Sequence, residues 1–151
     1  MNQILQRLSS VFLYTLPLKA SIPFGYDLFS KYSYLNVLKI ISFPVAIIEE
    51  SLPLGGLLFF VILFAGLVRN PNVPYFIRYN AFQAILLDIS LIIISYLLRI
   101  LSISSLGSFI SVLGSIVFIF TLCIFIYSIS QCIYGVEPEI PLISKSVRMQ
   151  I

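Results

Sequence analysis

One carboxylate, Asp88, lies where few charged residues are tolerated. It is the last polar residue of the run RNPNVPYFIRYNAFQAILLDI, which is followed at once by the apolar run SLIIISYLL. An ionised group at membrane depth costs at least ~2.5–3.5 kcal/mol on insertion scales, so such a residue usually faces a bundle interior or a wet path. The helix face that carries Asp88 is therefore the first candidate for chemistry, as an ion or proton site or as a polar contact.

Other polar side chains share this face. At about 100° per residue, they fall on one side of the helix and the bulky apolar side chains fill the other. We call them the polar stripe: Asn80, Gln83, Asp88, Ser95 and Arg99. Two interpretations stay open, namely bonding across a helix bundle at ~0.6–2 kcal/mol per contact or the lining of a hydrated groove. For Asp88 the first interpretation is a buried ion pair, with Lys39 as a candidate partner.

Two arginines and a run of small residues complete the set of candidates. Arg69 and Arg78 flank a tight polar loop, where they can reach lipid headgroups or dock an acidic partner. In the last apolar block, small residues align on one face, a pattern typical of close helix packing. They include Gly107, Ser111 and Gly114.

Residue types needed for catalysis or metal binding are scarce. The chain has no histidine, no glycine-rich phosphate loop and no nucleophile beside a base. Glu49 and Glu50 are adjacent and point about 100° apart on a helix. Cys123 and Cys132 fall on opposite sides of one helix and cannot pair. We therefore expect no enzyme, cofactor or metal site, and the scattered basic residues do not suggest nucleic acid binding.

Composition predicts a membrane protein. The 151 residues are 60% hydrophobic and 10% charged, with a mean hydropathy of +1.07, whereas soluble domains are about 25% charged. The apolar residues come in blocks long enough for a ~30 Å hydrocarbon core. We expect one all-α domain over residues 1–151, an integral membrane four-helix bundle.

The blocks and turn signals predict the order of the elements. Residues 2–16 are amphipathic and should form a short interfacial helix, and a turn-rich connector with Pro17 should follow. Pro44 should kink the first span, and the tail should be an ordered strap or a free end. The spans are predicted over residues 33–48, 52–68, 74–98 and 106–134, and the tail over residues 135–151.

Basic residues predict the orientation of these spans. With four spans, the N-terminus, the second loop and the tail share a side, and the only basic residue near the other side is Arg99. The positive-inside rule then places both termini in the cytosol-equivalent compartment. The shared side holds Arg7, Lys19, Lys31, Arg69, Arg78, Lys145 and Arg148.

The central run resembles a known family signature. RNPNVPYFIRYNAFQAILLDI, together with LPLKASIPFGYDLF near the start and EIPLISKSVRMQI at the end, is similar to the Tic-twenty family. This family comprises the small four-span subunit of the translocon at the inner envelope membrane of chloroplasts and its cyanobacterial relatives. The resemblance covers nearly the whole chain, from about Phe12 to Ile151, and matches Arg69, Arg78, Asn80, Gln83 and Asp88 to the family's polar motif.

The resemblance implies a role and a location. It implies a multi-pass protein of the plastid inner envelope, with stromal termini, that forms or scaffolds a preprotein-conducting path. Implied partners are other translocon subunits, transit preproteins, membrane lipids and further copies of the chain. The lack of a long presequence suggests a plastid-encoded or a cyanobacterial version, the latter in the plasma membrane. Two alternatives stay open: a small-solute or ion carrier with Asp88 as the coupling carboxylate, and a non-transporting assembly factor.

Overall fold

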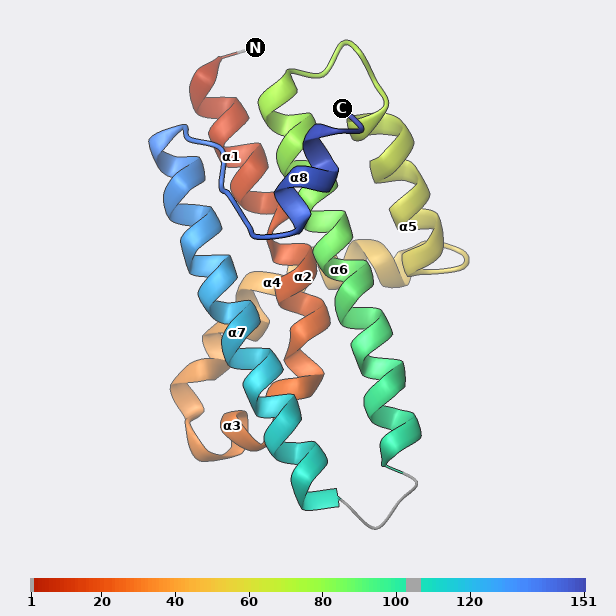
Figure 1. The fold of residues 1–151 in the computed structure, drawn as a ribbon, viewed down its shortest axis with the longest axis vertical. Helices are drawn as coiled ribbons and strands as arrows, with labels where there is room; N and C mark the ends of the chain where they lie inside the picture. Colours follow the sequence, from red (N-terminus) through yellow and green to blue (C-terminus); the bar gives the residue numbers. More distant parts are fainter. Residues whose placement is uncertain (1, 103–106) are drawn as a thin grey trace.

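Two long helices run the length of the molecule. The computed structural model describes residues 2–102 and 107–151, and no strand occurs among them. Helices α6 (Tyr75–Leu101) and α7 (Gly107–Tyr134) lie along the long axis (Figure 1), and each is long and apolar enough to cross a membrane. Residue 106, the expected start of the last span, lies outside the described residues. The prediction of an all-α membrane bundle is confirmed.

The N-terminal segment packs inside this bundle. Helices α1 (Gln3–Leu13) and α2 (Thr15–Ser21) follow each other end to end and run between α6 and α7 (Figure 1). At 1.5 Å per residue they rise about 28 Å, close to the thickness of a hydrocarbon core. The connector expected at Pro17 is therefore helical, because proline is tolerated in the first turn of a helix, where no intrahelical donor is needed.

The two faces of α1 explain this position. Its apolar residues Ile4, Leu5 and Leu8 are exposed on the outside of the bundle, whereas Ser10 is fully buried. Arg7 also turns inward and donates from Nη1 to the backbone oxygen of Ile133, 3.0 Å away. An amphipathic helix on a water-soluble core would be turned the other way. Here the polar face lies against the protein, where Arg7 finds an acceptor, and the apolar face suits lipid.

The expected first and second spans form one bent pair. A 3-10 turn, η1 (Ile22–Gly25), then α3 (Tyr26–Lys31) and η2 (Ser33–Leu35), reverse the chain at the end of the molecule opposite to the termini (Figure 1). Helix α4 (Asn36–Ser51) then meets α5 (Gly56–Leu63) at 102°.

The turn between α4 and α5 explains the bend. It uses left-handed backbone at Leu54 and Gly55. The pair is apolar enough to count as one span, so the described residues hold two spans, or three with this pair.

The tail returns to the bundle as a strap. After α7 it runs extended from residue 136 to residue 140 and ends in α8 (Ile143–Arg148), which packs on α6. Pro138 and Val147 are fully buried. Of the two forms expected for the tail, the structure has the ordered strap.

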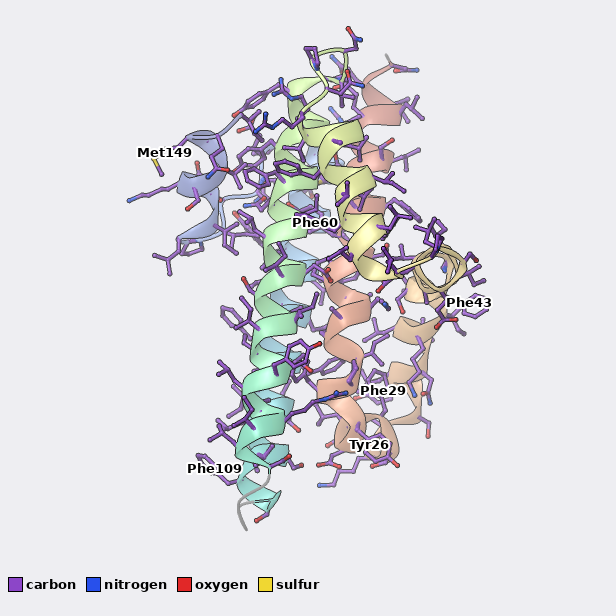
Figure 2. All side chains as sticks on the ribbon, turned by 90° about the vertical axis from the view of Figure 1, so that its right-hand side faces the viewer. Tyr26, Phe29, Phe43, Phe60, Phe109 and Met149 are labelled. Carbon is purple, nitrogen blue, oxygen red and sulfur yellow. The ribbon has the colours of Figure 1, made fainter. Side chains whose placement is uncertain are left out.

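Apolar side chains cover the outside of the molecule. Phe43 on α4, Phe109 on α7 and Met149 after α8 point away from the bundle (Figure 2), and all three are largely exposed. A soluble protein rarely leaves so much apolar surface uncovered. An exterior of this kind fits a hydrocarbon solvent.

Candidate functional site

The first half of the polar stripe is sealed inside the protein. Asn80 and Gln83 on α6 are fully buried, as is Tyr14 at the junction of α1 and α2. The Tyr14 hydroxyl lies 2.7 Å from Gln83 Oε1 and 3.0 Å from Asn80 Oδ1 and donates to these oxygens. Cys132 Sγ on α7 lies 3.4 Å from Asn80 Oδ1. This network joins three helices and leaves no room for a ligand.

The same stripe also holds the strap. Gln83 Nε2 donates to Ser144 Oγ at 2.8 Å and to the Pro138 oxygen at 3.2 Å, and Tyr79 Oη donates to the same oxygen at 3.1 Å. Irregular backbone at membrane depth is tolerated only where the protein itself satisfies its polar groups. Asn80 and Gln83, which we call the upper half of the polar stripe, lie where the tail passes, and Gln83 donates hydrogen bonds to the extended part of the tail.

The two arginines of the loop differ in role. Arg78 Nε donates to the backbone oxygen of Val68 at 2.9 Å. Val68 is the last residue of the π-helical turn η3 (Phe64–Val68). Arg69 is exposed, and its guanidinium lies 5.8 Å from the centroid of the Phe64 ring. Arg78 thus fastens the end of η3 to α6, while Arg69 stays available at the surface.

The second half of the stripe faces open space. Asp88 is partly buried and lines a cavity of about 460 Å³ between α5 and α6, together with Glu49 and Phe60. Lys19 on α2 forms an ion pair with Glu49. Lys39, the partner considered for Asp88, lies 4.5 Å above the ring of Phe29. The charges near Asp88 thus come from α2 and α4.

Ser95 and Arg99 continue this lining. Both border a cavity of about 270 Å³ that also contains Lys19 and Asp88, and both border a further cavity of about 320 Å³ next to Asp27. Ser95 is half-buried and Arg99 is exposed. The structure therefore brings Asp88, Ser95 and Arg99 to one side of α6 and keeps Asn80 and Gln83 in a separate, closed network.

The small residues of α7 lie in unlike surroundings. A Cβ on Gly114 would lie 3.2 Å from the backbone oxygen of Phe24 in η1, whereas a Cβ on Gly107 would meet nothing within 4 Å. Ser111 donates a hydrogen bond to the carboxylate of Asp27 on α3. Close approach of backbones is thus found at Gly114, and Ser111 adds a polar tie beside it.

Replacing Gly114 by leucine should push η1 away from α7. We expect the free energy of unfolding to fall by about 1–3 kcal/mol, because extra atoms in a close contact displace backbone. Thermal unfolding in mild detergent measures the loss. Gly107→Ala is the matched control and should leave the melting temperature unchanged, since the position is open. Equal losses in the two variants would contradict the close contact.

Metal ligands do not gather in the described part of the chain. No group of three His, Cys, Asp or Glu side chains is placed to hold an ion there. Cys123 is exposed and Cys132 is buried.

Comparison with known proteins gives the family. The family model described as "Chloroplast import apparatus Tic20-like" matches residues 3–147. The chain belongs to this family. "Protein TIC 20-II, chloroplastic" of Arabidopsis thaliana is 35% identical to it over 104 residues, which are 69% of this chain and 50% of that protein. "Tic20 family protein" of Synechocystis sp. is 32% identical over 97 residues, 62% of this chain and 61% of that protein.

A third relative matches a shorter part of the chain. "Protein TIC 20-v, chloroplastic" of Arabidopsis thaliana is 35% identical over 86 residues, 57% of this chain and 41% of that protein. The matched part thus spans about half the length of the curated relatives. The resemblance to the Tic20-like family is confirmed, and it covers nearly the whole chain.

Several residues of the site in this Tic20-like protein were not singled out from the sequence. Tyr14 carried no prediction, and Lys19 entered only as a positive charge for orientation. Glu49 was considered only beside Glu50, yet it pairs with Lys19. One signal could have found Lys19, since a lysine flanked by apolar residues in a membrane protein calls for a carboxylate partner.

Proposed function

We propose that this chain is a subunit of the plastid protein-import translocon and frames one side of a preprotein-conducting path in the inner envelope membrane. Membership of the Tic20-like family and two relatives named as chloroplastic support this proposal. The partners are other translocon subunits, preproteins in transit, membrane lipids and further copies of the chain.

The division of the polar stripe carries the proposal. Its upper half, at Asn80 and Gln83, is used up by contacts within the chain. Its lower half, at Asp88, Ser95 and Arg99, lines cavities of about 270 to 460 Å³ that open to the side of the bundle. A helix with its side chains is about 10–12 Å wide, so one chain of this size frames such a path and does not enclose it.

A scaffold of this kind needs rigid walls. The Tyr14 network and the strap fix α1, α6, α7 and the tail against one another. Because the buried amides of Asn80 and Gln83 are hydrogen-bonded to neighbouring elements, α6 is held in one register against them. The open side of α6 is then a fixed surface on which a partner, a second copy or a passing chain can be placed.

Depleting the chain from plastids should slow import across the inner envelope several-fold. Radiolabelled precursors should accumulate outside the stroma, because the path lacks one of its walls. Insertion of proteins into the outer envelope is the matched control and should proceed at the normal rate. Normal import kinetics after depletion would contradict the proposed role.

The positions of the basic residues at the two ends of the bundle support an orientation. The N-terminus, the loop before α6 and the strap lie toward one end of the molecule, and α3 lies at the other end (Figure 1). The sequence predicts Lys31 on the side of the termini. In the structure Lys31 is the last residue of α3 and lies at the opposite end of the bundle (Figure 1). Five of the nine basic residues stay on the terminal side, which still favours stromal termini: Arg7, Arg69, Arg78, Lys145 and Arg148.

Cysteine labelling tests this orientation. In a Cys123→Ser background, Asn72→Cys and Met149→Cys should react with an impermeant reagent from the same side of sealed vesicles. Ser30→Cys on α3 should react only from the opposite side. Labelling of all three from one side would contradict the arrangement.

A further inference from the structure

Three cavities join into one groove along α6. The cavity of about 460 Å³ and the cavity of about 270 Å³ share Glu49, Asp88, Ile92 and Tyr96 in their linings. The second of these shares Pro23, Ser95 and Arg99 with the cavity of about 320 Å³. We call the joined space the α6 groove. It runs from Asp88 to the end of the bundle where α3 lies.

The groove is closed at its inner end. Leu16 and Ile85 line that end, and both are buried in the packing between α2 and α6. At the other end, Asp27 and Arg99 are both exposed and border the outermost cavity. The groove is therefore closed at this inner end and open along the side of the bundle, where Leu57, Ile92 and Tyr96 of its lining are exposed.

One negative charge in the groove lacks a partner. Lys19 is paired with Glu49, whereas the Asp88 carboxylate accepts no hydrogen bond and forms no ion pair among residues 2–102 and 107–151. Glu49 lines the same cavity, but its charge is compensated by Lys19. A carboxylate held at membrane depth without a partner is costly. The inner part of the groove thus fits a cationic group.

The walls around Asp88 fit apolar neighbours of such a group. Leu57, Phe60 and Leu63 on α5 and Ile89 on α6 line the same cavity. Phe60 on α5 is labelled in Figure 2. A small hydrated ion would gain nothing from these walls. An amphipathic segment with a basic side chain between apolar ones would pair with the carboxylate of Asp88 and pack against the apolar lining.

Transit segments have this character. They are amphipathic, rich in arginine and poor in acidic residues, and the planar guanidinium of arginine matches a carboxylate with two parallel hydrogen bonds. We propose that the α6 groove binds an arginine side chain of a polypeptide segment, with the guanidinium on Asp88 and the flanking apolar side chains against α5. This inference rests on the proposed function and specifies where the chain in transit is held.

Peptide binding tests the groove directly. The full chain in lipid nanodiscs is titrated with a fluorescent 20-residue amphipathic peptide that has one central arginine and no acid, and binding is followed by anisotropy. The matched peptide has citrulline, which has the same shape without the charge. We expect the citrulline peptide to bind about ten- to one-hundredfold more weakly, the range of a charge-assisted hydrogen bond. Equal binding of the two peptides to the unmodified protein would overturn the proposal, whatever any variant does.

Two variants locate the interaction. Asp88→Asn should weaken binding of the arginine peptide about tenfold or more and leave the citrulline peptide unaffected. Glu50→Gln removes the same charge from an exposed position outside the groove and should change binding less than twofold. An equal loss in both variants would show a general charge effect and overturn the site.

Photocrosslinking distinguishes the groove from the lipid-facing surface. A photoreactive residue at position 92, which lines the groove, should crosslink to the peptide, whereas one at position 93, which does not, should crosslink to lipid. Lipid products alone at both positions would assign the cavity to lipid and overturn the proposal. If depletion blocks import while the two peptides bind equally, the translocon role stands and the groove inference fails.

Discussion

Replacing Tyr14 by alanine should lower the free energy of unfolding by about 3–5 kcal/mol, the cost of deleting a large buried ring. Tyr14 is fully buried at the junction of α1 and α2, and its hydroxyl is the donor that links Asn80 and Gln83 on α6. The substitution removes both the packing and the donor. Unfolding of the purified protein in mild detergent measures the loss.

Two controls separate these contributions. Tyr14→Phe keeps the ring and removes the hydroxyl, so it should cost about 1–3 kcal/mol, the usual cost of leaving a buried acceptor unpaired. Tyr134→Ala truncates a tyrosine that is 77% exposed and should change stability by no more than about 0.5 kcal/mol. If Tyr14→Ala and Tyr134→Ala lose the same amount, the network does not hold the bundle together.

The long helices were the most predictable part of the fold. The third span was expected over residues 74–98 and forms α6 from Tyr75 to Leu101. The last was expected over residues 106–134 and forms α7 from Gly107 to Tyr134. Such segments are read from hydropathy, because a helix is the simple way to satisfy the backbone in lipid.

The arrangement of the shorter helices was not readable from the sequence. The bend between α4 and α5 depends on Leu54 in left-handed backbone, a conformation that a leucine gives no reason to expect. The N-terminal helix was expected at the membrane interface, and it packs against α6 and α7. Its Arg7 finds an acceptor in the backbone of α7, which is tertiary information.

The polar stripe shows the same limit. The helical period places Asn80, Gln83 and Asp88 on one face of the helix, and the structure keeps this face. The sequence could not tell which part of the face would be covered, because that depends on the strap, whose Pro138 oxygen meets Gln83 across 55 positions of chain. Asn80 and Gln83 bond within the protein, whereas the lining of a hydrated groove stays a prediction for Asp88.

Ending the chain after Gly135 should destabilise the bundle and make α6 accessible to protease. The strap buries Pro138, Ile140 and Val147 against the bundle, and without it Gln83 Nε2 loses both of its acceptors. Leu142→Ala, which changes a strap side chain that is 87% exposed, is the control and should melt like the unmodified protein.

Gln83→Leu should have opposite effects in the full and the truncated chain. In the full chain it removes the donor that holds Pro138 and Ser144, so the melting temperature should fall. In the truncated chain the amide is a polar group without acceptors in an apolar setting, and replacing it by an apolar side chain of similar size should recover stability. Such a reversal follows only if the main role of Gln83 is to donate hydrogen bonds to the strap. A fall in melting temperature in both backgrounds would mean that Gln83 acts chiefly through Tyr14 and that the strap is held by packing alone.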